Sequence, residues 1–397
     1  MPEQKLKCLY ITFNGLMDPL GQSQILPYVE DLSKKGIKFY LVSLEKVKDL
    51  KEIKELKRKT ENLGISWYRL KYFKHHTLKM LLNILQCFLL SFYLLIFKKI
   101  KIIHARAYLP LFSTLLLKRI FKVKLIFDMR GFWPEELVDS GRITKDSIYY
   151  KILKFMEKES ILSSDWLITL TPEAEEIIKS NYQNIKLKTA WMPTCVDEDR
   201  FGTKDLISFN DKFVVVYLGS LWSYYNMPAM IDFFNLLKLK IPNSHFLILA
   251  NNEKGKLHPL LSEKGLRKEE YTVLNLKPAE VPKYLRSSNL GISFIYDFYS
   301  KKASFPTKIA EYLISGLPLV INTQSNFLKR IIASNKVGIV IERFDKEAYE
   351  KSIKDLTLLL KDKNLGERCK KIAKKYLAKG VCVEKYFKVY SELQRRP

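Results

Sequence analysis

The first half of the chain alternates short apolar runs with segments whose apolar residues recur at helical spacing. The runs are typical of buried strands, and helices are expected between them. Alternation of this kind predicts a parallel sheet covered by helices on both faces. The predicted strands lie at residues 8–11, 39–43, 66–70, 100–104, 125–128, 166–170 and 189–192.

The same pattern begins again after residue 210, where the apolar run 213–218 ends at Gly219. We therefore expect an α/β protein with two Rossmann-like domains that face each other across a cleft. The predicted domains cover residues 1–195 and 196–380, and a C-terminal helix within 381–397 is expected to pack back toward the first domain. Ligands of open α/β sheets bind at the carboxyl ends of the strands, so this layout favours an enzyme that closes on its substrate.

Composition excludes a disordered chain, since 47% of the 397 residues are hydrophobic. Lys and Arg number 68 against 42 Asp and Glu, which gives a net charge of +26. Such an excess suggests an anionic partner: nucleic acid, an acidic membrane surface or a phosphorylated substrate. A Lys-rich background would give the same excess with no partner at all.

The longest apolar stretch runs from residue 78 to 97 and is borderline in length for a membrane-spanning helix. Its place between predicted strands favours a helix inside the first domain, with one face dipping into a membrane and lysines on both flanks. A spanning helix is the less favoured alternative. Five widely spaced cysteines fit a reducing cytoplasm. We therefore expect a cytoplasmic protein that associates peripherally with the cytoplasmic face of the membrane.

The segment 304–321 carries the most specific pattern of the chain. It predicts a loop, a helix that opens at Pro306 and Thr307, and a buried strand. The free backbone N–H groups of such a helix start can receive a phosphate. Lys308 lies in the first turn, where the helix dipole disfavours a cation unless an anion is bound. Glu311 follows on the same face, and its carboxylate can accept hydrogen bonds from ribose hydroxyls. An ordinary surface Lys–Glu pair is the alternative.

This segment resembles the donor-binding motif of family 4 glycosyltransferases, in which Pro-x-Lys is followed by Glu-Tyr and Gly-x-Pro. The resemblance implies the GT-B architecture, with an N-terminal acceptor domain and a C-terminal donor domain. It also implies that Lys308 contacts the donor phosphates as a catalytic residue and that Glu311 binds the ribose. Many members have Glu where this chain has Ala303. Backbone groups nearby are expected to replace that contact, those of Ser304, Phe305 and Pro306.

The turn Gly219-Ser220 is similar to the first turn of the family's donor domain. Family members often carry an Arg in that region to hold the diphosphate, and this turn has none. Glycine permits a close backbone approach, so we expect the turn to present backbone N–H groups to the donor.

Two groups of loop residues are predicted to form the acceptor site at the edge of the first sheet. The run 18–24 resembles the N-terminal loop of a bacterial branch of family 4, which lies near the transferred sugar. Arg106 follows the fourth strand, and a charged and aromatic run follows the fifth. The predicted acceptor and cleft residues are Asp18, Gly21, Gln22, Arg106, Phe132, Trp133 and Glu135.

Roles in this cluster follow from side-chain chemistry. Arg106 and Arg130 suit a phosphate, and Phe132 or Trp133 suits stacking on a sugar or lipid. Asp128 or Glu135 is a candidate for proton handling, and Asp128 and Arg130 are counted with Lys308 as catalytic candidates. The alternative is that Asp128 only orients Arg130 through an ion pair.

The sequence thus predicts a retaining glycosyltransferase, hexosyl or N-acetylhexosaminyl, that uses a nucleotide-diphosphate sugar and no metal or other cofactor. UDP-sugar is preferred to GDP-sugar. The family implies a glycan or polyprenyl-linked acceptor in cell-surface polysaccharide or glycoconjugate assembly. A two-Rossmann nucleotide-sugar epimerase or phosphorylase is the alternative. A basic nucleic-acid-binding protein is more remote, because no recognised module is present and nucleic acid is not an expected partner.

Overall fold

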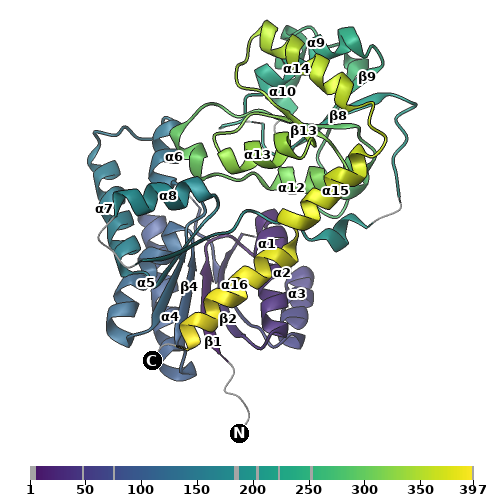
Figure 1. Cartoon of the computed structure of the whole chain (residues 1–397). Helices are drawn as coiled ribbons and strands as arrows, with labels where there is room; N and C mark the ends of the chain where they lie inside the picture. The colour runs from purple at the N-terminus through teal and green to yellow at the C-terminus, as the bar shows by residue number, and fades with distance from the viewer. Residues whose placement is uncertain are drawn as a thin grey trace. The chain divides into compact units, whose positions relative to one another are not determined.

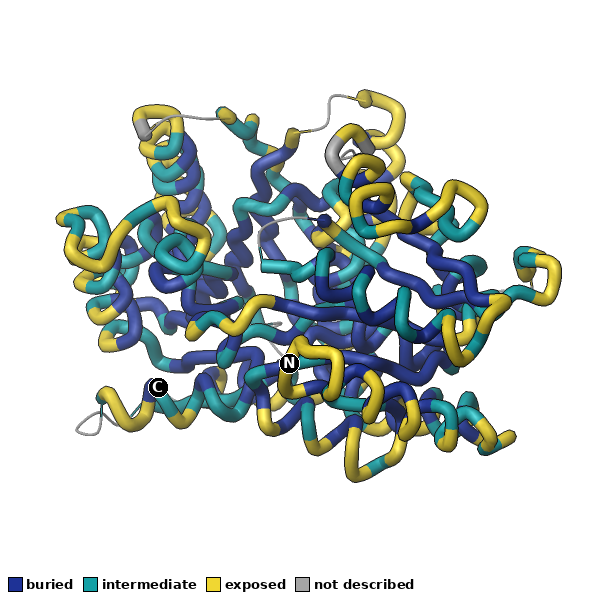
Figure 2. Tube along the Cα trace, turned by 90° about the horizontal axis from the view of Figure 1, so that it is seen from above, coloured by how far each residue is buried: buried dark blue, intermediate teal, exposed yellow. Residues whose placement is uncertain are grey.

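A computed structural model describes residues 6–46, 49–74, 77–182, 187–202, 205–221, 224–250 and 254–395. The chain divides into two compact units (Figure 1). Unit 1 contains the chain up to Pro193 together with the segment from Lys379 onward, and unit 2 runs from Thr194 to Ala378. Figure 2 shows that buried residues concentrate in the extended strands, whereas exposed residues lie on outer helix faces and in connections.

Unit 1 is built on a parallel sheet, which in its described residues has seven strands in the order β3-β2-β1-β4-β5-β6-β7. Strand register places Thr12 beside Arg106 and Arg106 beside Asp128 at the carboxyl ends of three adjacent strands. The strands are β1 (Lys7–Thr12), β2 (Lys38–Glu45), β3 (Ser66–Lys71), β4 (Ile102–Arg106), β5 (Lys124–Asp128), β6 (Trp166–Thr169) and β7 (Lys188–Trp191).

The helices of unit 1 include one that the sequence analysis placed in a loop. Pro19 opens α1 because its fixed φ suits a first helical position, so the run 18–24 is mostly helical. The helices are α1 (Pro19–Gln24), α2 (Leu26–Lys34), α3 (Leu50–Asn62), α4 (Thr77–Lys98), α5 (Tyr108–Phe121), α6 (Trp133–Asp139), α7 (Ile148–Ser163), α8 (Pro172–Asn181) and α16 (Lys379–Gln394).

Unit 2 has a second parallel sheet, whose described strands follow the order β10-β9-β8-β11-β12-β13. Its strands are β8 (Phe213–Leu218), β9 (Ser244–Leu249), β10 (Tyr271–Leu274), β11 (Leu290–Ser293), β12 (Leu319–Ile321) and β13 (Gly338–Val340). Its α-helices are α9 (Met227–Lys240), α10 (Lys254–Glu263), α11 (Val281–Arg286), α12 (Thr307–Ile314), α13 (Asn326–Ser334), α14 (Lys346–Leu359) and α15 (Leu365–Tyr376). Short 3-10 turns are η1 (Glu198–Phe201), η2 (Lys268–Glu270) and η3 (Tyr299–Ala303).

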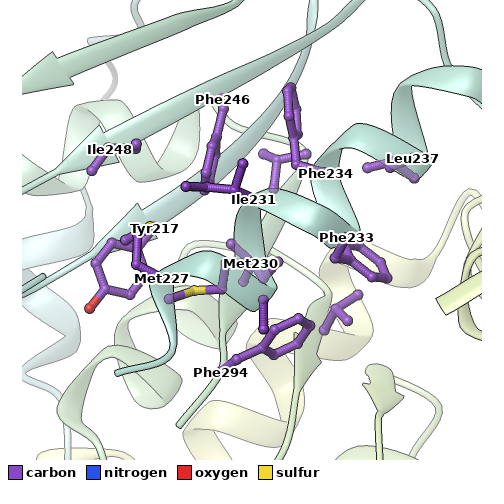
Figure 3. Close-up of a cluster of buried hydrophobic side chains, with 14 of the residues drawn as sticks. Tyr217, Met227, Met230, Ile231, Phe233, Phe234, Leu237, Phe246, Ile248 and Phe294 are labelled. Carbon is purple, nitrogen blue, oxygen red and sulfur yellow. The ribbon is translucent and has the colours of Figure 1, made fainter. Parts of the chain in front are cut away.

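The core of unit 2 is rich in aromatic side chains between α9 and the sheet (Figure 3). Phe234 stacks on Phe246, and Phe233 meets Phe294 edge to face. Full burial of one such side chain contributes roughly 1.5–3 kcal/mol. Tyr217 belongs to the same cluster and is completely buried, so β8 is held firmly where it approaches α12.

Tyr312 fixes α12 against the strands that precede the candidate site. Its ring lies where a Cβ at Gly291 would stand, 2.6 Å from the nearest ring atom, so β11 needs glycine there. Its hydroxyl accepts a hydrogen bond from the backbone N–H of Leu218 at 2.8 Å. Together these contacts hold the start of α12 beside the end of β8.

Candidate functional site

Lys308 lies in the first turn of α12 and is only 4% exposed. Its ammonium nitrogen lies 3.5 Å from the ring centre of Tyr225 and 4.1 Å from that of Tyr217. Within the described part of the chain this nitrogen has no hydrogen-bond partner. An ordinary surface Lys–Glu pair, the alternative left open by the sequence, does not fit a side chain buried in this way.

The Lys308 ammonium has no close anionic partner within the described residues. Burial holds its pKa well below the usual range, and the nearby Glu311 carboxylate opposes that effect only in part. Burial likewise raises the pKa of Glu311, against the effects of Arg200 and Lys308. A buried amine without an acceptor is costly to the fold, so the arrangement favours a ligand that brings negative charge.

Gly219 contributes to this site in a different way from the one predicted. Its N–H donates to the carbonyl of Leu249 at 2.9 Å, so this group is not free to bind a phosphate. Its φ is +130°, and a Cβ there would lie 3.0 Å from the Lys308 nitrogen. A side chain at this position would be strained by the positive φ and would force the lysine ammonium to shift by a few tenths of an ångström. The carbonyl of the adjacent Ser220 accepts a hydrogen bond from the Tyr217 hydroxyl.

Backbone donors before α12 are also fewer than the sequence suggested. The N–H of Ser304 donates to the Lys301 carbonyl at 3.2 Å, and Pro306 has no N–H. Phe305 is buried, and its carbonyl accepts from the Thr194 hydroxyl at 2.8 Å. No side chain caps the helix start. At the start of α12 the N–H groups of Thr307 and Lys308 remain as donors, because the N–H of Ile309 already donates to the Pro306 carbonyl at 3.2 Å.

Tyrosines and a second lysine complete the surroundings, and the sequence analysis did not assign them roles. Lys301 on η3 is 3% exposed, and its ammonium lies 3.6 Å from the ring centre of Tyr224. The rings of Tyr224 and Tyr225 are 5.5 Å apart between centres. The only sequence signal for this cluster is a Tyr pair that follows the turn after β8.

Unit 1 contains an open pocket of about 400 Å³ at the carboxyl edge of its sheet. Of the predicted acceptor residues, Arg106, Arg130 and Trp133 line this pocket. The full lining also includes Phe13, Asn14, Lys46, Tyr72, Ala107, Tyr108, Leu109, Pro110, Gly131 and Glu136.

Two residues predicted beside Trp133 do not line the pocket. Phe132 is 5% exposed and belongs to the hydrophobic core. Glu135 is buried on the side of α6 that meets α7, where Lys154 donates to it at 2.9 Å and Tyr150 at 3.2 Å. Stacking on a ligand therefore falls to Trp133, and the proton-handling hypothesis for Glu135 loses its geometric basis.

Asp128 is held in a polar network beneath the pocket. Tyr386 of α16 donates to one carboxylate oxygen at 2.9 Å, and the His104 ring lies 3.5 Å from the same oxygen. Arg130 lies 3.5 Å from the other oxygen. Burial acts to raise the pKa of Asp128, but Arg130, His104 and Arg106 outweigh burial and hold it well below the usual range. These contacts suit a carboxylate that orients Arg130 better than one that accepts a proton.

The run that contains Asp18, Gly21 and Gln22 makes its contacts within unit 1. Asp18 accepts from the Lys46 ammonium at 2.7 Å, and the Gln22 amide donates to the Leu16 carbonyl at 2.7 Å. A Cβ at Gly21 would lie 2.0 Å from the carbonyl oxygen of Gly15. The close approach that Gly21 permits is therefore to the chain's own backbone.

Unit 1 also exposes apolar side chains on three helices, and α5 packs between α4 and α7. By length and composition, α4 can cross a membrane over Leu78–Lys98, where mean hydropathy is 2.2 and 28% of the apolar stretch is buried. Exposed members of this three-helix apolar surface are Leu78, Leu81, Leu82, Leu85, Leu89, Tyr93, Ile96, Phe97, Leu116, Ile120, Ile148, Ile152, Phe155 and Leu162.

Two parallel-sheet α/β units of this kind define a protein of the GT-B fold. Solved structures agree: sucrose-phosphate synthase of Thermosynechococcus elongatus matches with a TM-score of 0.74 at 13% identity, covering 98% of this chain and 99% of that one. The Anabaena HepE structure in complex with UDP and glucose matches with a TM-score of 0.68 at 12% identity, covering 98% and 100%.

Sequence comparison finds matches among glycosyltransferases. Residues 201–376, which lie within unit 2, match the family model of glycosyl transferases group 1. An uncharacterized glycosyltransferase of Methanocaldococcus jannaschii is 24% identical over 290 residues, which are 66% of this chain and 68% of that protein. Lys308, Glu311 and Gly219 all lie within the matched region.

Proposed function

We propose that the protein transfers a hexosyl or N-acetylhexosaminyl group from a nucleotide-diphosphate sugar to a glycan or polyprenyl-linked acceptor in cell-surface glycan assembly. The observation that carries this proposal is the buried Lys308 ammonium, which lacks a hydrogen-bond acceptor at the start of α12. The HepE structure with UDP and glucose supports a UDP-sugar as the donor. GDP-sugar is the less favoured donor.

The proposed chemistry breaks the bond between the anomeric carbon and the donor diphosphate. Negative charge develops on the leaving phosphate, where Lys308 and the first N–H groups of α12 stabilise it. The acceptor hydroxyl attacks from the same face and passes its proton to the leaving phosphate, so configuration is retained without a protein nucleophile. In this scheme the lysine and the helix start supply the positive charge, and no metal is needed.

Glu311 is proposed to bind the nucleotide ribose. It lies one turn beyond Lys308 and is half-buried. A carboxylate can accept hydrogen bonds from two neighbouring hydroxyls, and such contacts contribute roughly 1.5–3 kcal/mol each when the acceptor is charged. Replacing Glu311 with Ala is therefore expected to weaken donor affinity more than turnover, and calorimetry with UDP measures this directly. Unchanged UDP affinity would contradict the role.

We also propose that unit 1 rests on the cytoplasmic face of an anionic membrane through the three-helix apolar surface. Singly scattered apolar residues are normal on proteins, but a group of this size marks an interaction surface. Exposed lysines adjoin it, among them Lys99, Lys101, Lys122 and Lys151. Each basic residue near an anionic membrane contributes about 1 kcal/mol.

A thermal-shift screen of UDP, GDP and their sugars tests the donor proposal, because a ligand that binds only the folded state raises the melting temperature. UDP-sugars are expected to stabilise the wild type and to lose this effect in Lys308→Met. Lys351→Met is the matched control, since Lys351 is an exposed lysine on α14 of the same unit. An equal shift in Lys308→Met would contradict the proposed contact.

A further inference from the structure

Positively charged side chains outnumber negatively charged ones in the lining of the pocket of unit 1. Three cations line it, Lys46, Arg106 and Arg130, and one carboxylate, that of Glu136. Asp128 lies beneath them with 1% exposure. Aromatic rings share the wall with these charges, including Tyr72, Tyr108 and Trp133.

Two of the three cations already have a carboxylate partner. The Lys46 ammonium lies 2.7 Å from Asp18, and the Arg130 guanidinium lies 3.5 Å from Asp128. Arg106 differs from both. It is 5% exposed, and its side chain makes no hydrogen bond or ion pair within the described residues. A guanidinium has five N–H donors in a planar fork, and the open pocket that Arg106 lines leaves these donors available to a ligand.

Arg106 lies at an edge of the sheet that suits ligand binding. It ends β4 between Thr12 of β1 and Asp128 of β5, at the carboxyl edge where open α/β sheets bind ligands. Burial and the neighbouring Arg130 both lower its pKa, and Asp128 only partly compensates. Two guanidinium groups therefore lie near one buried carboxylate, and only Arg130 is paired with it.

We propose that Arg106 anchors a phosphoryl subsite in unit 1, so that the acceptor is a phosphorylated molecule whose phosphate or diphosphate enters this pocket. The inference rests on the proposed function, because it names the chemical class of the acceptor. The fork of Arg106 matches two oxygens of a phosphoryl group, and Arg130, held by Asp128, adds a second cation. Trp133, which is partly exposed, offers an aromatic face to the group attached to that phosphate.

Inorganic pyrophosphate is the probe, titrated by calorimetry into protein already saturated with UDP so that the donor site is filled. Wild type is expected to bind it, Arg106→Gln to lose at least tenfold in affinity, and Arg106→Lys to lose less. Arg142→Gln, an exposed arginine of unit 1, is the charge-matched control and should bind as wild type does. Equal affinity in Arg106→Gln, or no binding by wild type, would overturn the proposal.

Stability separates this role from a structural one. Without ligand, Arg106→Gln is expected to melt close to the wild-type temperature, because the Arg106 side chain makes no hydrogen bond or ion pair within the described residues. A clear fall in melting temperature, with pyrophosphate affinity in Arg106→Gln equal to that of wild type, would instead make Arg106 a structural residue and overturn the proposal.

This design distinguishes a failure of the donor hypothesis from a failure of the acceptor hypothesis. If UDP does not stabilise the wild type, the proposed donor chemistry fails, and pyrophosphate binding to Lys308→Met still tests the subsite of unit 1. Farnesyl diphosphate in detergent and glucose 1-phosphate then distinguish a lipid-linked from a soluble source of the phosphoryl group. Binding of at least one that depends on Arg106 supports the proposal, and Arg106-independent binding of both contradicts it.

Discussion

At the scale of the residue, Lys308 is the side chain on which the proposed chemistry depends. Lys308→Met is expected to lower kcat by about a hundredfold or more, the typical cost of removing one donor to a developing oxyanion. The unfolding free energy should hold or rise, since an apolar chain of similar length replaces an amine that lacks a hydrogen-bond partner. Initial rates and urea unfolding measure the two effects, with Lys351→Met as control. Normal turnover in Lys308→Met would contradict a catalytic role for Lys308.

Gly219 provides a second test at this scale. Gly219→Ala is expected to cost about 1 kcal/mol or more in unfolding free energy, because its φ of +130° disfavours a side chain. It should also reduce kcat, because the new Cβ displaces the Lys308 ammonium. Gly265→Ala separates these effects, since Gly265 has φ +79° and open space around its Cβ position. If both variants retain turnover equally, the contact between Gly219 and Lys308 is not needed.

Single residues also show which features of the site can be predicted from the sequence. The motif placed Lys308 and Glu311 on one turn of a helix because Pro306 and helical spacing are local signals. The sequence did not predict that Tyr217 and Tyr225 enclose the ammonium, or that the Gly219 N–H is already bonded to Leu249. These facts depend on contacts between segments that are distant along the chain, and the spacing of residues in the sequence does not indicate such contacts.

At the scale of the element, α16 reaches the polar network of unit 1 through Tyr386. Tyr386→Phe removes the hydroxyl that donates to the buried Asp128 carboxylate. We expect a loss of roughly 1–3 kcal/mol in unfolding free energy, because a charged acceptor loses a partner. Tyr93→Phe, at a 51% exposed tyrosine of α4, is the control. Equal urea midpoints and slopes for the two variants would show that this bond contributes little.

Helices α4, α5 and α7 define the membrane prediction. Vesicle co-sedimentation should increase with the fraction of anionic lipid and decrease with salt, because basic residues adjoin the three-helix apolar surface. Leu85→Glu should reduce recovery several-fold, since it places a charge on that surface. Leu239→Glu alters a 74% exposed leucine of α9 in unit 2 and should bind as wild type does. Equal recovery on neutral vesicles would contradict the membrane proposal and would mean that the net charge reflects only a Lys-rich composition.

The elements were predictable where their signal is local. Alternating apolar runs correctly predicted both sheets, because strands buried on both faces read as continuous apolar segments. The helix α1 was missed because six residues with an internal glycine carry little helical signal. Its crossing over the backbone at Gly15 is a tertiary contact.

At the scale of the whole molecule, the two-sheet architecture and the match of residues 201–376 to glycosyl transferases group 1 confirm the GT-B fold expected from the sequence. Two proposed interactions involve the excess of positive charge behind the net charge of +26. They are contact with an anionic membrane and recognition of phosphoryl groups. Neither involves nucleic acid. Both concern unit 1, whereas the donor chemistry belongs to unit 2, so variants in one unit are expected to leave ligand binding in the other intact.

The most direct test of the proposed function is transfer of label from a radioactive UDP-sugar to a polyprenyl-linked acceptor extract. Wild type is expected to release UDP and to move the label onto the acceptor, while Lys308→Met does so at least a hundredfold more slowly. Product analysis without acceptor should return the UDP-sugar unchanged. Conversion to an epimeric UDP-sugar without any transfer, or identical transfer by Lys308→Met, would contradict the proposal.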